Sequence, residues 1–502
     1  MQLGEITTRY EQNMLVQRIR EAVLELRAAG KPVRILVQAP CGAGKTVCSS
    51  MVMHGAMEKQ KTSAFMVRGR LLVTNKSKTL TRCGIPHAIL MDGHDYYPNP
   101  VTVVSVDTYA SRAVEKGTIP LIIPNVWIID EAHLAQSDRW ISMIKDGDVV
   151  IGFTATPAGK DGRGMGGFWQ KLIIGPTYKE LLDKKLLVPC VVFGETMPDL
   201  SQLSIHDGDW SQEKVGEIMS ATELVGDVVR DWKRWGENRP TLGFASSVDQ
   251  SIGLMNEFNA KGIPAAHVDA DTETEDRERI FGELSAGKIK VIWNVGVLTT
   301  GVDFPFASCL LLAFATKSVI KFMQVVGRGL RTFDGKQDCI VIDFGGNVHR
   351  HGWPTEDREW SLDTESTVQD RDLQRKDREQ KPREPLCCPK CGAMRESGPK
   401  CHHCGHQHLR TGIKVKFKDG HIGPLKRKPP KKQSTDYQTG WMRILAVCAY
   451  KGWPCKSASV MFKKSFGDWP ENMGVGPIPD ASKRNAKVGL VFPGFLRRKA
   501  KA

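Results

Sequence analysis

The sequence predicts an α/β protein: two tandem units with parallel sheets, then a small cysteine- and histidine-rich module and a basic, mostly helical C-terminal module. Two alternations of short apolar runs with amphipathic segments, over residues 31–155 and 241–342, predict the two units. Continuous apolar runs rich in β-branched residues are typical of strands buried on both faces of a parallel sheet. The amphipathic segments between them predict helices that form right-handed crossovers.

The expected elements follow the chain in order. In the first unit the buried strands are Val33–Gln38, Ser63–Val67, Val101–Val106, Val126–Ile129 and Val149–Phe153. In the second unit the strands are Thr241–Ala245, Ala265–Val268, Lys290–Trp293, Cys309–Leu312 and Cys339–Ile342. The helices of the second unit include Val248–Lys261, Glu273–Ala286 and Val319–Gly327.

Changes of composition predict the domain boundaries. Seventeen of the 31 residues from Thr355 to Pro385 are charged, so this stretch is expected to be an exposed linker or a solvated helix. Aromatic residues among lysines near the C-terminus could stack on bases, although a small helical core with a basic surface is the favoured interpretation. The expected division is a first lobe (1–195), a connector (196–222), a second lobe (223–354), a charged linker (355–386), a cysteine/histidine module (387–408), a basic linker (409–436) and a basic C-terminal module (437–502).

The positive charge is concentrated at the C-terminal end. The chain carries +15, and residues 410–502 hold 21 Lys/Arg and 5 Asp/Glu, which is +16, so the rest carries −1. This segregation predicts a polyanionic partner for that end, with a protein partner of the C-terminal module left open. No apolar run approaches the roughly 18 residues that span a bilayer, and the N-terminus lacks the order of a signal peptide. Four of the thirteen cysteines form two close pairs and most others lie in apolar segments, which predicts a cytoplasmic protein without a membrane partner.

The run Ala-Pro-Cys-Gly-Ala-Gly-Lys-Thr (39–46) follows an expected strand and precedes a helix. Its spacing matches a P-loop, with Ala39 in place of the usual first glycine. Lys45 would reach the β- and γ-phosphates and the Thr46 hydroxyl would bind Mg²⁺. An ordinary tight turn is the alternative, but the Lys-Thr pair makes phosphate binding the better interpretation. The residues expected to bind the nucleotide here are Gly42, Ala43, Gly44, Lys45 and Thr46.

Two adjacent carboxylates, Asp130 and Glu131, end an apolar strand in the run Asp-Glu-Ala-His, and Asp130 lies 85 residues after Lys45 (130 − 45). Asp130 is expected to help hold Mg²⁺, and Glu131 to face the water that attacks the γ-phosphate. The alternative is a helix N-terminus enriched in acidic residues. The position after a P-loop favours the catalytic interpretation.

Arg328 and Arg331 lie three residues apart on an expected helix, so both can enter one cleft. Opposite a nucleotide, arginines stabilise the transferring phosphoryl group. Taken alone, the pair would be interpreted as a solvated helical face.

A cluster of four cysteines has the spacing C-x₂-C-x₉-C-x₂-C, at Cys388, Cys391, Cys401 and Cys404. This spacing predicts a structural Zn²⁺ site, because four protein ligands leave no open position for catalysis. Nearby residues leave one substitution in the ligand set open, namely Cys387, His402, His403, His406 and His408.

Together with these motifs, further segments in order resemble the superfamily 2 helicases, and within them the RadD-like and UvrB-like group of bacterial and phage DNA-processing motors in DNA repair or recombination. The resemblance covers roughly residues 5–350. It rests on the P-loop, the Asp-Glu-Ala-His box, Arg9-Tyr10-Glu11-Gln12, Arg68-Gly69-Arg70-Leu71, Ser105-Val106-Asp107-Thr108-Tyr109, Thr154-Ala155-Thr156, Gly301-Val302-Asp303 and Gln324-Val-Val-Gly-Arg328-Gly-Leu-Arg331.

The resemblance implies two RecA-like lobes that hydrolyse ATP, with Mg²⁺, in the cleft between them. It implies that Gln12 reads the adenine edge beside Arg9 and Tyr10, and that Gln324 acts with Arg328 and Arg331. Gly301 and Asp303 would face both nucleotide and strand, and the segments at 68–71 and 105–109 would touch the nucleic-acid backbone. The sequence departs from the pattern at Phe314-Ala315-Thr316, where RadD-like chains tend to have Arg-Pro-Thr.

Three functions remain open at this level. The favoured one is an ATP-dependent helicase or translocase, with DNA favoured over RNA because the likeness is to DNA-processing motors. A double-strand DNA translocase or remodeller that does not unwind is the second. A DNA-binding adaptor with an ATP switch is the third, against which the intact motif residues argue.

Overall fold

The structure is a computed structural model of the 502-residue chain. It describes residues 2–119, 121–135, 138–145, 147–194, 198–201, 203–206, 209–220, 222–299, 304–379, 385–396, 398, 400–407, 441, 444, 445, 448 and 455–466. The chain divides into two compact units, residues 1–411 and 412–502. Within the described residues, no helix is both long and apolar enough to cross a membrane.

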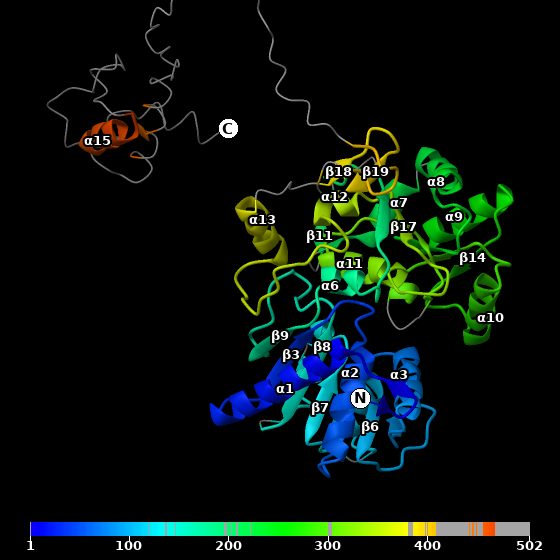
Figure 1. The fold of residues 1–502 in the computed structure, drawn as a ribbon, viewed down its shortest axis with the longest axis vertical. Helices are drawn as coiled ribbons and strands as arrows, with labels where there is room; N and C mark the ends of the chain where they lie inside the picture. The colour runs from blue at the N-terminus through cyan, green and yellow to red at the C-terminus, as the bar shows by residue number, and fades with distance from the viewer. Residues whose placement is uncertain are drawn as a thin grey trace, which may run out of the picture. The chain divides into compact units, whose positions relative to one another are not determined.

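The first lobe is a seven-stranded parallel sheet in the order β5-β6-β4-β7-β8-β3-β9 (Figure 1). All five predicted strands of this lobe are present. The strands are β3 (Arg34–Gln38), β4 (Ser63–Val67), β5 (Ala88–Leu90), β6 (Val101–Ser105), β7 (Val126–Ile129), β8 (Val149–Thr154) and β9 (Lys171–Ile174). The helices and short turns of the lobe are α1 (Tyr10–Ala28), α2 (Lys45–Met57), α3 (Arg70–Arg82), α4 (Val106–Tyr109), a π-helix (Ala110–Glu115), a 3₁₀ turn (Ala132–Leu134), α5 (Asp138–Ile141) and α6 (Tyr178–Asp183). A short hairpin, β1 (Gln2–Leu3) and β2 (Ile6–Thr7), precedes them.

The central strands are buried on both faces, as their continuous apolar sequences predict. Every residue of β4, β6 and β8 is buried. Gly152 in β8 is required by this packing, because a Cβ there would lie 2.4 Å from the ring of Trp169. The strands therefore place their carboxyl ends, and the loops that follow, at one edge of the sheet.

The second lobe is an eight-stranded sheet in the order β14-β15-β13-β16-β17-β10-β19-β18. The strands are β10 (Cys190–Phe193), β13 (Thr241–Ala245), β14 (Ala265–Val268), β15 (Val291–Asn294), β16 (Cys309–Ala313), β17 (Cys339–Asp343), β18 (Leu386–Cys387) and β19 (Ala393–Arg395). Its helices are α8 (Thr222–Trp235), α9 (Val248–Ala260), α10 (Thr274–Ser285), α11 (Val319–Gly329) and α12 (Asn347–His351), with a 3₁₀ turn at Val297–Thr299. The connector carries β11 (Ile205–His206), β12 (Asp209–Trp210) and α7 (Gln212–Met219).

Sheet membership changes two of the predicted boundaries. The strand β10 pairs in parallel with β17 of the second lobe, so the predicted end of the first lobe at residue 195 is wrong. The β18–β19 hairpin of the cysteine module pairs with β10 through β19, so this module extends the second sheet rather than standing apart from it. Local composition could not show this, because strand pairing joins segments that are far apart in the sequence.

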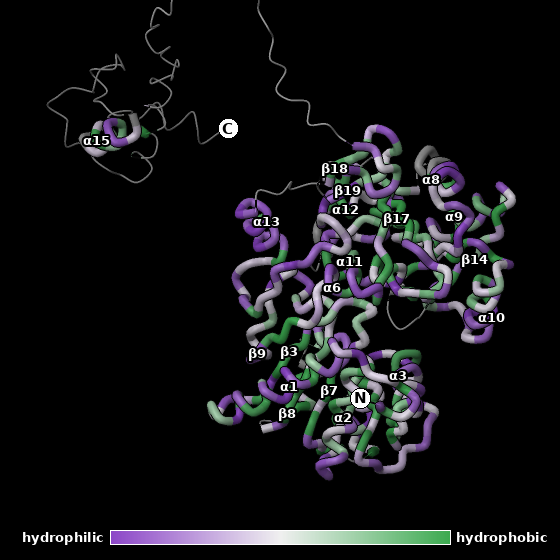
Figure 2. The backbone as a smooth tube through the Cα atoms, in the orientation of Figure 1, coloured by the Kyte–Doolittle hydropathy of each residue, from purple (hydrophilic) through white to green (hydrophobic). Residues whose placement is uncertain are grey.

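The predicted charged linker is ordered over its described residues. Residues 368–378 form helix α13 (Val368–Arg378), in which Val368, Arg371, Asp372 and Lys376 are buried. The helix is hydrophilic along its length in Figure 2, which is why composition predicts a solvated segment. The prediction of an exposed or solvated element is therefore wrong, and charged partners within the segment explain the burial.

In the second compact unit the structure describes α15 (Cys455–Phe466) and four preceding residues. The rings of Trp441 and Phe462 meet edge to face, with centroids 5.6 Å apart, and both side chains are buried. This packing supports the interpretation of these aromatics as a small helical core. The whole predicted basic linker (409–436) and most of the basic C-terminal module lie outside the described residues.

Candidate functional site

The loop between β3 and α2 has the backbone of a phosphate-binding turn. Gly42 and Gly44 adopt left-handed conformations, with φ of 84° and 87°, and α2 begins at Lys45 directly after Gly44. The φ of Gly44 would strain any other residue, and a Cβ there would also lie 2.1 Å from Nε2 of Gln12 and displace that side chain. Lys45 Nζ donates to the carbonyl oxygens of Ala39 (3.0 Å) and Pro40 (3.3 Å), which keeps the ammonium over the loop.

The carboxylate pair follows β7 on a neighbouring part of the same sheet edge. The backbone N–H of Glu131 donates to Asp130 Oδ1 at 3.0 Å. Glu131 has φ 47° and ψ 48°, a left-handed conformation that is costly for a residue with a side chain and that concentrates at functional sites. Burial raises the pKa of Asp130 above its ordinary value, and the charge of Glu131 adds to the shift. A cation bound here would offset both effects.

A chain of hydrogen bonds joins three motifs across the two lobes. Gln324 Nε2, from α11 of the second lobe, lies 3.0 Å from His133 Nε2, and His133 Nδ1 lies 3.0 Å from Thr154 Oγ1. The Thr154 hydroxyl in turn donates to the Thr156 carbonyl at 3.2 Å. Burial lowers the pKa of His133 to about 4, so the ring is neutral and accepts from Gln324 while its Nδ1–H donates to Thr154. Hydrogen bonds therefore link α11 of the second lobe to the end of β8 in the first lobe.

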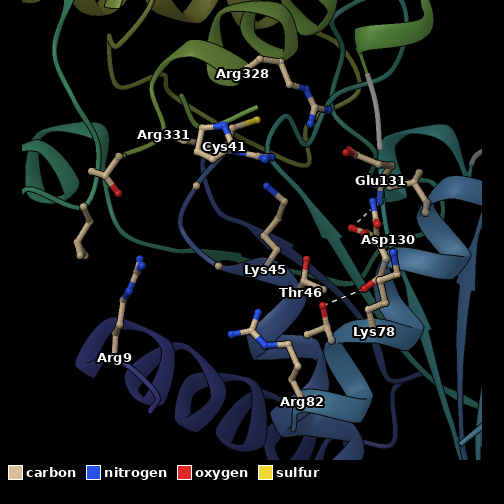
Figure 3. Close-up of a pocket in the computed structure, with 18 residues that line it drawn as sticks. Arg9, Cys41, Lys45, Thr46, Lys78, Arg82, Asp130, Glu131, Arg328 and Arg331 are labelled. Atoms are coloured by element: carbon tan, nitrogen blue, oxygen red, sulfur yellow. Dashed lines mark hydrogen bonds between the residues drawn. The ribbon is translucent and has the colours of Figure 1, made fainter. Parts of the chain in front are cut away.

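The P-loop and the carboxylate pair of the first lobe face the arginines of α11 and the residues after it across a cavity of about 540 Å³. In Figure 3, Lys45, Thr46, Asp130 and Glu131 rise from the first lobe toward Arg328 and Arg331, which descend from the second. The lining residues are Arg9, Cys41, Gly42, Gly44, Lys45, Thr46, Leu72, Asn75, Lys78, Thr79, Arg82, Asp130, Glu131, Leu186, Pro305, Arg328, Arg331 and Thr332.

The charges of this cavity fit a nucleoside triphosphate with Mg²⁺. Six cationic side chains line it against two carboxylates. An excess of fixed positive charge favours a polyanion, and the helix N-terminus at Lys45 presents backbone N–H groups to a phosphate. Thr46 and Asp130 would offer oxygen ligands of the kind that Mg²⁺ prefers. When bound, the metal would neutralise charge developing on the transferring phosphoryl group.

Most of the residues predicted to bind the nucleotide line this cavity. The others either pack beside the residues that line it or lie outside the described residues. Gln12 is buried, accepts from the Arg9 N–H at 2.8 Å and packs beside Gly44. Gln324 faces His133, and Ala43 is buried within the loop. Gly301 and Asp303 lie outside the described residues.

Helix α3 contributes to the cavity residues that the sequence motifs did not predict. Asn75, Lys78, Thr79 and Arg82 line the cavity from this helix. The signal was present, because Lys78 and Arg82 lie four residues apart and therefore share one helical face. Behind them, Lys76 is fully buried and donates to the Thr46 carbonyl (3.1 Å) and to both Ser49 and Ser50, so it supports the first turns of α2.

The four predicted zinc ligands come together. The Sγ atoms of Cys388, Cys391, Cys401 and Cys404 all lie within 4.8 Å of one another. The Cys388–Cys404 and Cys391–Cys401 pairs are each 3.7 Å apart, close to the edge of about 3.8 Å of a tetrahedron with Zn–S bonds of about 2.3 Å. The donor set and its geometry therefore fit a four-coordinate Zn²⁺.

Comparison with known proteins agrees with this architecture. Residues 5–159 match the family described as "Type III restriction enzyme, res subunit", and residues 223–333 match "Helicase conserved C-terminal domain". A "51.5 kDa protein" of a Lactococcus phage (isolate 7-9) is 28% identical over 446 residues, which are 86% of this chain and 93% of that protein. The "Putative mitochondrial ATP-dependent helicase irc3" of Schizosaccharomyces pombe is 30% identical over 260 residues, 50% of this chain and 42% of that protein.

The fold also matches a solved structure. "The fragment structure of a putative HsdR subunit of a type I restriction enzyme from Vibrio vulnificus YJ016" aligns with a TM-score of 0.53 and 20% identity, covering 69% of this chain and 66% of that one. This likeness shows the two-lobed fold. With both halves of the ATP cleft in one cavity and both halves of the sequence matched in order, the chain belongs to the superfamily 2 helicases, a family of ATP hydrolases.

Proposed function

We propose that the protein is an ATP-driven helicase or translocase that moves along DNA. The observation that carries the proposal is the composition of the cleft, in which Lys45 and the carboxylate pair belong to one lobe and Arg328 and Arg331 to the other. Phosphoryl transfer depends on positioning and charge stabilisation. Hydrolysis is then fastest when the lobes are closed, and release of product lets them separate.

The mechanism assigns a step to each side chain. Lys45 and the backbone of the P-loop would hold the β- and γ-phosphates, and Thr46 with Asp130 would hold Mg²⁺. Glu131 orients the attacking water, and Arg328 and Arg331 stabilise the negative charge that develops on the phosphoryl oxygens. The hydrogen bonds from Gln324 through His133 to Thr154 would couple a movement of the second lobe to the end of β8 in the first lobe.

The nucleic-acid strand is proposed to cross the other half of the sheet edge. There the loops after β4, β5 and β6 are tied together by Asp92. Its N–H donates to Thr108 Oγ1 (3.2 Å), its carbonyl accepts from Arg70 (2.8 Å) and its carboxylate pairs with Arg112. Arg68 is 66% exposed and Arg112 is 45% exposed, so both can reach a phosphate backbone.

DNA is proposed as the substrate because the matched relatives include restriction-enzyme subunits by their printed descriptions. ATPase rates should be titrated with single-stranded DNA, duplex DNA and RNA of equal length, with Lys45→Ala as the inactive control. We expect the strongest stimulation by DNA. Equal stimulation by RNA would remove the DNA preference, and no stimulation by any of the three would overturn the motor. Strand displacement, measured beside displacement of a triplex strand from an intact duplex, separates unwinding from translocation.

The strand surface has its own test. Arg112→Ala should raise the half-saturating DNA concentration, and Arg27→Ala, an exposed change at the far end of α1, should not. Each lost phosphate contact should lower the magnitude of the log–log salt slope by about 0.9 on duplex DNA. Equal behaviour of the two variants would show that the strand does not use this edge.

We also propose that residues 410–502 anchor the motor to DNA, since their net charge is +16 against −1 for the remainder (21 − 5 = 16 and 15 − 16 = −1). A tethered cationic segment raises the effective concentration of the substrate. Truncation after Leu409 should flatten the salt dependence of DNA binding and leave the ATPase rate at saturating DNA nearly unchanged. An unchanged slope would point to a protein partner instead.

The cysteine cluster is proposed to hold one structural Zn²⁺ per chain, in a reducing, cytoplasmic setting that keeps the thiolates available. Elemental analysis of protein purified without chelators should find zinc at one equivalent. Replacement of Cys388 by Ser should lower that content while ATP binding persists, because the cluster lies on the sheet edge beyond β10 and not on the cleft. Zinc-free protein with an intact fold would contradict the site.

A further inference from the structure

The segment from Trp353 to Glu379, here called the clip, connects the two lobes a second time. It leaves the second lobe after α12, reaches the first lobe, and leads through α13 toward β18 and β19 of the second sheet. Both flanks of the clip therefore belong to the second lobe, while its middle lies on the first. Its sequence is so charged that composition alone predicts a solvated linker.

The middle of the clip pairs with a glycine-rich loop of the first lobe through backbone hydrogen bonds. Gly164 N–H donates to the Asp363 carbonyl (2.8 Å) and Gly166 N–H to the Leu362 carbonyl (2.9 Å). On the other side of this contact, the Val368 N–H donates to the Gly162 carbonyl at 2.9 Å. Leu362 also packs against the hydrophobic core of the first lobe.

The glycines of this loop are explained by the clip. A Cβ at Gly164 would lie 2.3 Å from the Asp363 oxygen, and a Cβ at Gly166 would lie 2.5 Å from the Leu362 oxygen. Gly167 lies in the same loop and would meet nothing within 4 Å. Close approach of another backbone is one of the reasons why a position requires glycine. The loop is thus shaped to receive the clip, and Gly167 provides a matched control.

The clip also reaches the back of the ATP cleft. The glycine-rich loop that the clip contacts follows Thr154–Thr156 in the sequence. Thr154 is in turn connected to Gln324 by hydrogen bonds through His133. Clip residues line a small cavity of about 40 Å³ together with the P-loop and α11. Its walls include Gln38 and Pro40 from the first lobe, Met323 from the second, and Asp357, Arg358 and Trp360 from the clip.

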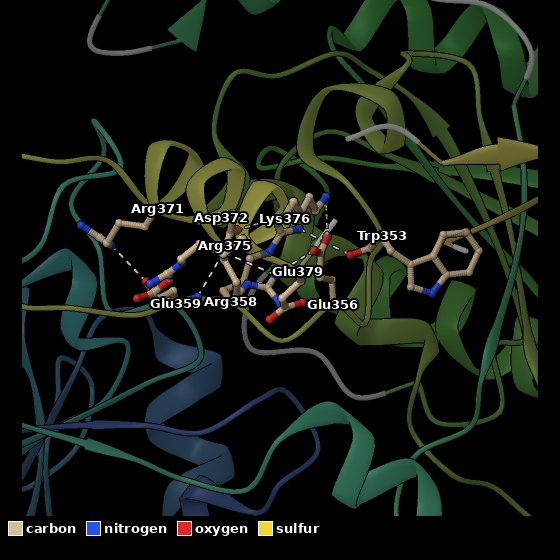
Figure 4. A network of polar contacts seen from close by, with 10 residues as sticks. Trp353, Glu356, Arg358, Glu359, Arg371, Asp372, Arg375, Lys376 and Glu379 are labelled. Carbon is tan, nitrogen blue, oxygen red and sulfur yellow. Dashed lines mark hydrogen bonds and ion pairs between the residues drawn. The ribbon is translucent and has the colours of Figure 1, made fainter. Parts of the chain in front are cut away.

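Buried ion pairs hold the clip in this shape (Figure 4). Arg358 pairs with Asp372 at 2.9 Å, and the two side chains are only 2% and 5% exposed. Glu356 accepts a hydrogen bond from Arg375 at 2.7 Å and forms an ion pair with Lys376 at 3.0 Å. Buried pairs of this kind contribute little net stability, but breaking one of them leaves an uncompensated charge. They therefore favour the conformation of the clip in which these charges are paired.

We propose that the clip restrains the opening of the ATP cleft, and that Gly164, Gly166, Arg358 and Asp372 are positioning residues for the reaction. The inference rests on the proposed function, since it assigns a limit to the lobe movement of that motor. With the clip fastened, nucleotide-free protein keeps a large fraction of molecules with the lobes close enough to bind ATP. With the clip released, that fraction falls, and the apparent affinity for ATP falls by the same factor.

The test measures the distance between the lobes in full-length, nucleotide-free protein. Donor and acceptor dyes are attached through non-natural amino acids at the exposed positions Lys61 and Lys288, one in each lobe. Gly166→Ala and Asp372→Asn should each shift the distance distribution toward open forms. Each should also raise the dissociation constant of a fluorescent, non-hydrolysable ATP analogue, by about tenfold if the closed fraction falls about tenfold.

Matched controls separate the clip from general damage. Gly167→Ala changes the same loop without a collision, and Glu359→Gln removes the exposed ion pair with Arg378, so neither should move either readout. The two releasing variants act on opposite sides of the contact, so loss of folding in one leaves the other as the test. Distances and ATP affinity equal to wild type in a folded releasing variant would overturn the proposal. Because no strand is present, this outcome is independent of whether nucleic acid stimulates the ATPase.

Discussion

The ATP cleft and the clip are both dense in charge, yet they use it in opposite ways. Six cations in the cleft face only two carboxylates, and all of them line an open cavity. In the clip, Glu356, Arg358, Asp372 and Arg375 are paired with one another and are at most 17% exposed. Unbalanced charge at a large cavity indicates where a charged ligand binds, whereas balanced and buried charge indicates a structural constraint. Composition cannot separate the two cases.

The largest expected effect lies in the cleft. Arg331→Ala should lower the ATPase rate on the order of 10³-fold or more, because the phosphoryl charge loses its partner from the second lobe. The free energy of unfolding should change little, since Arg331 lines the cavity. Rates are compared with Arg82→Ala, a cation at the same cavity on α3. If Arg331→Ala left turnover near that of wild type, Arg331 would not stabilise the transferring phosphoryl group.

Glu131→Gln should lower turnover by about 10²- to 10⁴-fold, the range for loss of a general base. ATP binding should persist, because the amide has almost the shape of the carboxylate. Single-turnover kinetics and equilibrium nucleotide binding measure the two effects separately. A variant that hydrolyses ATP normally would remove Glu131 from the mechanism.

Neutralising a buried carboxylate of the clip should lower the free energy of unfolding. Asp372→Asn leaves Arg358 buried with its main partner neutralised, and breaking a buried pair costs about 3–5 kcal/mol. Glu359→Gln affects a pair that is 42% to 66% exposed, and such pairs contribute about 0–1 kcal/mol. Urea unfolding of both variants measures the contrast. Equal losses would show that the clip does not depend on buried pairing.

The smallest effect concerns His351, which is fully buried and stacks on Phe322. Burial lowers its pKa to about 3, and the charges of Arg358 and Arg350 contribute. The unfolded chain therefore binds the proton first as the pH falls below about 6.5, and stability is lost from there toward pH 3. Between pH 4 and 6 the slope of wild type should exceed that of His351→Gln by about 1.4 kcal/mol per pH unit. Asp343, with its pKa raised by burial to about 6, acts in the opposite sense in both proteins and cancels in the comparison. Parallel slopes would contradict the buried neutral ring.

The nucleotide half of the molecule could be predicted from the sequence because its signals are local. Gly42, Gly44 and Lys45 lie within one turn, and Asp130 and Glu131 are adjacent, so neither depends on knowing the fold. The contribution of Lys78 and Arg82 required knowledge of which face of α3 meets the cleft. The clip and the pairing of β10 with β17 depend on contacts between segments more than 140 residues apart. Composition cannot show such contacts.

The hairpin of the cysteine module has one more consequence. Strand β19 covers β10, which would otherwise end the second sheet with a row of unpaired amide and carbonyl groups. Uncovered edge strands are templates for pairing with another copy of the chain. Removal of the proposed zinc would loosen the two residue pairs that join β19 to β10 among the described residues, Val192 with Met394 and Phe193 with Ala393. Loss of the metal is thus expected to show itself first as self-association of the protein, before any change in its chemistry.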